Sequence, residues 1–193
     1  GELKANFKGT YRGDKYELLF SLKSYANETQ RRQYIDNYIT EDNCQTESYT
    51  ISNSERDTPQ ITLEYNASSD QMLKEYGEES LLKIIPLKFP YLEEPKKRKL
   101  PIQINYPEYR SDTLEFTIPP PYKITTLPPD VTTHSKYGDY QVRFVQNGNI
   151  VMAIKQMKIN AGQYPLSEYL DFYSFIIALR ESENSFYITL KKT

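Results

Sequence analysis

The sequence has 193 residues, enough for one core or two closely packed lobes, since a chain of this length buries roughly 70% of the surface that its unfolded form exposes. Its 24 basic and 26 acidic residues give a formal charge of −2, which excludes a strong electrostatic attraction to nucleic acid or to an anionic membrane. The single cysteine, Cys44, excludes a disulfide framework and a thiolate metal cluster.

The sequence shows no segment suited to a membrane. No apolar run approaches the roughly 20 residues of a spanning helix, and the first residues lack the basic and apolar regions of a signal peptide. We therefore expect no membrane insertion. Because the chain starts at Gly1 without an initiator methionine, as after cloning, we expect any targeting signal to lie upstream.

The N-terminal part predicts the order strand, helix, helix, strand, strand. Apolar and polar residues alternate at 3–11, 49–51 and 61–65, as in half-buried strands. Residues 14–25 carry a helical stripe, although apolar residues at every second position from 16 to 22 leave a strand as the alternative. Asn27-Glu28-Thr29-Gln30 predicts a capping box for the second helix. We expect one side of that helix to pack on the sheet through Tyr34, Ile35, Tyr38 and Ile39.

A boundary between two lobes is predicted near residue 88. The short apolar run 81–87 is followed by the loop 90–101, which holds three prolines and a cluster of charges. We therefore divide the chain into an N-terminal lobe, 1–88, and a C-terminal lobe, 89–193.

Strands dominate the predicted C-terminal lobe. Residues 102–104, 114–118 and 140–144 alternate, and Asn147-Gly148 predicts a tight hairpin because both residues tolerate positive φ. The returning strand, 150–159, changes its apolar phase, which suggests a bulge near Lys155-Gln156.

The chain is predicted to finish with a helix and a last strand. We expect Ser167 to cap the helix, and residues 186–190 to form the strand. The apolar stripe of the helix is Tyr169, Leu170, Tyr173, Ile176 and Ile177. The fold class that follows is α+β and β-rich, mostly antiparallel, with a sandwich-like C-terminal lobe and two or three helices.

One catalytic hypothesis arises from Cys44, His134 and Asp139, which follow the chain order of a transglutaminase or papain-like triad. A nucleophilic thiolate usually lies at a helix N-terminus, whereas Cys44 leads into an alternating strand. His134 lies in a Thr-Thr-His-Ser stretch that favours a solvated turn. We therefore expect no catalytic residue in this chain and keep a thiol enzyme as an alternative.

No metal or cofactor site is predicted. One His and one Cys would need at least two carboxylates to complete a zinc site, and no short-spaced cluster supplies them. Calcium loops and glycine-rich phosphate loops are also missing from the sequence.

Tyrosine dominates the aromatic residues, with 18 Tyr, 8 Phe and no Trp. Tyrosines in loops are candidates for an exposed platform that binds a sugar or peptide; the alternative is that these rings pack over turns with their hydroxyls outward. The candidate ligand-binding residues are Tyr106, Tyr109, Tyr122 and Tyr137. Pro119-Pro120-Pro121-Tyr122 also matches a WW-domain ligand, but we expect it to end one strand and start the next at a sheet edge.

Several motifs occur together in a recognisable order. They are Ile118-Pro119-Pro120-Pro121-Tyr122, Leu127-Pro128, Tyr137-Gly138-Asp139-Tyr140 and Ile159 to Pro165, with Lys8 to Gly13 and Arg98 to Ile102 upstream. This order resembles the C-terminal domain of unknown function that follows a transglutaminase-like domain in bacterial envelope proteins. Pro121 departs from the family pattern, which commonly has Gly before the tyrosine.

The resemblance implies a mostly antiparallel β domain that follows a transglutaminase or protease-like domain in a Gram-negative envelope or secreted protein. We therefore expect a non-catalytic accessory domain, in the periplasm or at the cell surface, that packs on the upstream domain of the same polypeptide or presents a peptide or glycan to it. A free-standing carbohydrate or peptide binder that uses exposed tyrosines is the alternative. No nucleic acid partner is expected.

Overall fold

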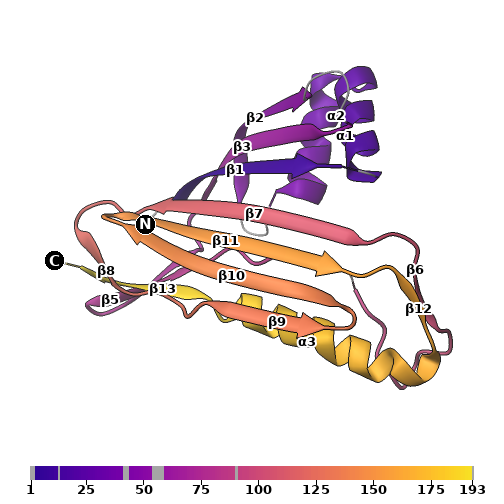
Figure 1. The fold of residues 1–193 in the computed structure, drawn as a ribbon. Coiled ribbons are helices and arrows are strands. Elements are labelled where there is room, and N and C mark those ends of the chain that lie inside the picture. Colours follow the sequence, from indigo (N-terminus) through magenta and orange to yellow (C-terminus); the bar gives the residue numbers. More distant parts are fainter. Residues whose placement is uncertain (1–2, 13, 41–43, 54–58, 90, 193) are drawn as a thin grey trace.

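A computed structural model of the chain describes residues 3–12, 14–40, 44–53, 59–89 and 91–192. Within these residues the fold is β-rich, with several antiparallel sheets and three α-helices (Figure 1), which confirms the predicted fold class.

The N-terminal sheet has the order β1-β3-β2 and is antiparallel throughout. Its strands are β1 (Leu3–Tyr11), β2 (Gln45–Asn53) and β3 (Ile61–Ser69). Helices α1 (Asp14–Tyr25) and α2 (Glu28–Tyr34) lie against one face, as Figure 1 shows. The predicted order of strand, helix, helix, strand, strand is confirmed. On the covered face Phe7 stacks on Tyr65 with 4.5 Å between ring centroids.

The capping box of α2 is confirmed, but its predicted apolar side is only partly right. The Gln30 N–H donates to Asn27 Oδ1 at 2.9 Å, and the Asn27 N–H donates to Gln30 Oε1 at 3.0 Å. After α2 the chain widens into a π-helical turn, Ile35–Ile39, which changes the rotation per residue. Of the four predicted residues, Ile35 is fully buried, Tyr34 and Ile39 are half-buried, and Tyr38 is exposed.

Tyr49 on β2 connects the N-terminal sheet to α2, since its hydroxyl donates to Glu28 Oε1 at 2.7 Å. Burial, and then this hydrogen bond, raises the pKa of Tyr49 from 10.0 to about 12.

The stability that comes from this raised pKa is fully present at pH values below the pKa of Tyr49 in the unfolded chain. It is lost as pH rises through the pKa of Tyr49 in the folded chain. We expect the free energy of unfolding to fall less steeply between about pH 10 and 12 in Tyr49→Phe than in the native chain, measured by urea unfolding. Equal slopes would contradict this.

The central sheet has the order β7-β11-β10-β9, and each pair is antiparallel. Its strands are β7 (Glu108–Thr117), β9 (Val131–Ser135), β10 (Gly138–Asn147) and β11 (Ile150–Ile159). The predicted hairpin joins β10 to β11, but its turn residues are Gly148 and Asn149, one position later than predicted, because Asn147 pairs with Ile150. Gly148 has a positive φ of +62°, as tight hairpin turns of this kind require.

The bulge predicted near Lys155 is wrong. β11 pairs with β7 and with β10 in a continuous register from Ile150 to Ile159. The apolar phase changes because Lys155 occupies an inward position of the strand, between Ala153 and Met157, and is itself buried.

The buried Lys155 belongs to a polar cluster that connects four parts of the C-terminal half. Its Nζ donates to the Ile85 carbonyl at 2.7 Å and to Glu183 of the last helix. Glu183 also accepts from the Tyr140 hydroxyl at 2.5 Å and from the Leu87 N–H at 2.9 Å. Burial lowers the pKa of Lys155, opposed by the charge of Glu183, and burial also raises the pKa of Tyr140.

The last helix, α3 (Tyr169–Asn184), lies against the inner face of the central sheet (Figure 1). Ser167 does not cap it, because Ser167 lies inside the preceding 3-10 turn Leu166–Glu168 and the N-cap residue Glu168 makes no side-chain cap bond. Leu170 is exposed, so the predicted stripe is partly wrong. The buried positions repeat with a helical period along Tyr169, Phe172, Phe175, Ile176, Leu179 and Glu183.

The C-terminal sheet has the order β4-β5-β13-β8 and crosses the predicted lobe boundary. Its strands are β4 (Leu73–Tyr76), β5 (Glu79–Lys83), β8 (Tyr122–Thr126) and β13 (Tyr187–Lys192). β5 comes before residue 88, yet it pairs with β13, with Leu81 opposite Thr189. The last strand is confirmed, and it is central to a sheet built from both predicted lobes.

Two short connections complete the described fold. The strands β6 (Ile102–Ile104) and β12 (Gly162–Tyr164) form a two-stranded sheet. The prolines after Ile118 form a turn between β7 and β8, in which the Tyr122 N–H donates to the Pro119 carbonyl at 3.1 Å. β7 and β8 are edge strands, as the proline motif predicts.

Candidate functional site

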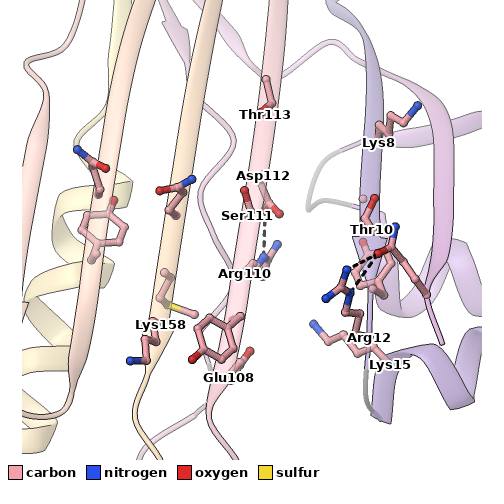
Figure 2. A pocket seen from close by; sticks show the side chains of 18 of the residues that line it. Lys8, Thr10, Arg12, Lys15, Glu108, Arg110, Ser111, Asp112, Thr113 and Lys158 are labelled. Carbon is pink, nitrogen blue, oxygen red and sulfur yellow. Dashed lines mark hydrogen bonds and ion pairs between the residues drawn. The ribbon is translucent and has the colours of Figure 1, made fainter. Parts of the chain in front are cut away.

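The open faces of the N-terminal and central sheets enclose a long trough of about 2240 Å³. β1 lies beside β7 along it, and the faces that bound the trough are those opposite the helices (Figure 1). Figure 2 shows side chains from both sheets pointing into this space, with Lys8 and Arg12 on one wall and Ser111 and Lys158 on the other.

The N-terminal wall is a ladder of paired polar side chains. Asn6 Nδ2 donates to Asn66 Oδ1 at 2.9 Å, and Asn66 Nδ2 donates to Ser48 Oγ at 2.9 Å. One step along β1, Lys8 pairs with Glu64 at 2.6 Å. These residues occupy the outward positions of strands whose inward residues are buried or half-buried, so the alternation of the sequence produces the wall.

The central wall is crossed by two rows of side chains that the strand register brings together. Each row takes one outward residue from each of four strands. The first row is Tyr109, Lys158, Asp139 and His134. The second row is Ser111, Gln156, Gln141 and Thr132.

His134 lies in β9 opposite Asp139, so the turn predicted around it is wrong. Its Nδ1 is 2.9 Å from Asp139 Oδ1, and the two side chains are 76% and 51% exposed. Cys44 directly precedes β2 and is half-buried. The structure therefore joins two members of the hypothetical triad on the central sheet and places the thiol just before β2 of the N-terminal sheet.

The described residues contain no group of three or more His, Cys, Asp or Glu side chains that could hold a metal ion. In the same residues, no helix has both the length and the apolar character needed to cross a membrane.

The four candidate tyrosines have different surroundings. Tyr106 and Tyr109 line the trough and are 78% and 69% exposed, although Tyr109 belongs to β7 and not to a loop. Tyr122 is half-buried at the start of β8, where its hydroxyl donates to Glu75 at 2.6 Å. That bond, and then burial, raises the pKa of Tyr122.

Tyr137 cannot belong to an exposed platform, because it is only 2% exposed. Its ring packs edge-on against Tyr164 and Phe172, at 5.1 and 5.4 Å between centroids, and its hydroxyl donates to the Glu168 carbonyl at 3.2 Å. Tyr137 therefore fits the alternative only in part, since its ring is packed but its hydroxyl is not turned outward.

Three cations lie toward one end of the trough. Arg12 donates to Gln60 Oε1 at 2.8 and 3.1 Å. Lys15 Nζ lies 5.9 Å from the centre of the Tyr11 ring, and Lys158 Nζ lies 5.8 Å from that of Tyr109. In the described part of the chain these contacts are thus with a neutral amide and two phenol rings, and Lys158 also lies opposite Asp139 in the strand register. Glu108 lies at the same end, as Figure 2 shows.

Sequence reasoning missed the polar rows and the cations. Outward polar residues of a strand look like ordinary surface in one dimension. They become a site only when the register of four strands aligns them and when a second sheet faces them.

A comparison with family models matches residues 80–189, more than half of the chain, to the family described as "Domain of Unknown Function with solved-structure structure (DUF3858)". No curated protein and no solved structure matches the chain. The matched segment starts in β5 and ends in β13, two strands that pair with each other, so it spans all of the central sheet and α3. The chain belongs to the DUF3858 family.

Proposed function

We propose that this chain is a non-catalytic accessory domain of a larger envelope protein, in which its trough holds a ligand for an upstream transglutaminase- or protease-like domain. The family match supports a domain of unknown function, and the resemblance of the sequence motifs supplies the expected neighbour and the extracytoplasmic location.

The trough carries this proposal. An open channel of about 2240 Å³ is larger than the 300–1,000 Å³ of a typical small-molecule site and suits an extended ligand. Its walls are rigid, because each is a hydrogen-bonded sheet with a buried opposite face. Rigid sheets hold polar side chains in fixed positions, which suits recognition.

The test removes residues 3–192 from the native polypeptide and compares turnover of two substrates by the remaining protein. Binding energy from a remote site is lost only for substrates that reach the site. We expect a short peptide substrate to keep its kcat/KM within about twofold, and a polymer-attached substrate to lose tenfold or more, mostly through KM.

Two outcomes would contradict the proposal. Loss of turnover for both substrates would make this chain part of the catalytic unit. Turnover by the isolated chain, abolished by Cys44→Ser, would favour the thiol enzyme. Fractionation of cells that express the native protein tests the location separately, and recovery in the cytosol would be against it.

A further inference from the structure

The second row of side chains on the central sheet offers groups that both donate and accept hydrogen bonds. Ser111 and Thr132 carry hydroxyls, and Gln156 and Gln141 carry amides. Sugar hydroxyls also donate and accept, so each can pair with either kind of group. Because β10 and β11 are paired on both sides, a ligand on this face meets side chains and not the main chain. That distinguishes the face from a strand edge, where extended peptides bind.

Two tyrosine rings lie along the same trough. Tyr106 and Tyr109 expose more than two thirds of their surface, and an exposed ring in a polar channel offers an apolar face with a polar rim. Sugar rings have the same combination of apolar faces and polar edges.

The end of the trough near Arg12, Lys15 and Lys158 adds positive charge. The three cations line this end of the channel with two carboxylates near them: Glu108 (Figure 2), and Asp139, which lies opposite Lys158 in the strand register. The other charges of the lining are mostly paired, for example Arg110 with Asp112 at 3.0 Å. A carboxylate that enters this end meets charged donors from the start of the N-terminal helical region and from β11.

We propose that the trough binds an acidic glycan, an extended chain of sugars that carry carboxylate groups. This inference rests on the proposed function and gives its ligand a chemical class. The hydroxyls bind the row of Ser111, Gln156, Gln141 and Thr132, a sugar ring stacks on Tyr109, and a carboxylate lies between Arg12 and Lys158.

The experiment titrates the 193-residue chain by calorimetry with oligogalacturonate, with a neutral malto-oligosaccharide of the same length and with polyglutamate. We expect saturable binding of oligogalacturonate, weakened by salt, and at least tenfold weaker binding of both other probes. Equal binding of the neutral sugar would refute the role of the cations. Equal binding of polyglutamate would refute recognition of a glycan.

Matched variants locate the site. Arg12→Gln with Lys158→Gln, and separately Tyr109→Ala, are expected to weaken oligogalacturonate binding about tenfold or more, with melting temperatures unchanged. Lys97→Gln and Tyr91→Ala are the controls, since both residues are exposed and lie outside the trough lining. No binding of oligogalacturonate, or equal losses in variants and controls, overturns the inference.

These results are separable from the proposed function. If the isolated chain fails to bind but its removal from the native protein still impairs the polymeric substrate, only the class of ligand is wrong. If the chain binds but its removal has no effect on turnover, the inference holds and the chain is a free-standing binder.

Discussion

Replacing Glu183 by leucine is expected to lower the free energy of unfolding by about 3–5 kcal/mol, since it leaves the buried charge of Lys155 without its counter-ion. The Lys155 and Glu183 side chains are both 0% exposed, so water cannot take over the lost contacts. The Tyr140 hydroxyl and the Leu87 N–H lose their acceptor as well. Urea unfolding at neutral pH measures the change.

The control is the pair Lys155→Met and Glu183→Leu, singly and together. The double variant is expected to be less destabilised than the sum of the single variants, because it removes both buried charges.

The pH dependence of the free energy of unfolding gives a second readout. Native Lys155 has a lowered pKa, and without Glu183 that pKa falls further, so the unfolded chain binds more protons. Glu183→Leu should therefore gain stability as pH rises toward 10.5. Strict additivity in the double variant, or absence of this gain in Glu183→Leu, would contradict the account.

Gly138→Ala is expected to cost about 3 kcal/mol or more, because the new Cβ collides with main chain and not with a movable side chain. A Cβ at Gly138 would lie 2.0 Å from the Lys158 carbonyl oxygen. Gly138 pairs with Ile159 on one side and with Ser135 on the other, so neither strand can withdraw without losing hydrogen bonds. Thermal unfolding followed by circular dichroism measures the loss.

Gly148→Ala is the matched control for this prediction. Its φ of +62° strains any L-residue, but a Cβ there has no neighbour within 4 Å. We expect it to cost only about 1 kcal/mol, from backbone strain alone. If Gly138→Ala were no worse than Gly148→Ala, the close approach of β10 and β11 at Gly138 would be wrong.

The alternation of apolar residues predicted most of the strands, because half-buried strands need it. It failed at Lys155, where a charged residue occupies an inward position and the pattern imitates a bulge. It failed again around His134, because a run of small polar residues in an edge strand has no apolar signal. Both errors come from tertiary context: a partner such as Glu183 makes burial tolerable, and a neighbouring strand makes a polar segment extended.

The candidate site was predictable only in part. Tyr106 and Tyr109 follow from composition and local sequence, but the burial of Tyr137 depends on Phe172, far along the chain. Gln141 and Gln156 acquire a shared row only through the register of β10 and β11. The lobe boundary near residue 88 was predicted from a proline-rich loop, which is a local signal. The pairing of β5 with β13 joins segments far apart in the chain, so no local pattern could reveal it.

The position of β13 between β5 and β8 has a consequence for biosynthesis. The ribosome delivers β5 and β8 long before it releases residues 187–192, and until then the slot between those two strands is empty. Nascent chains therefore expose unpaired strand edges, which recruit other chains, and the C-terminal sheet closes only after synthesis has passed β13.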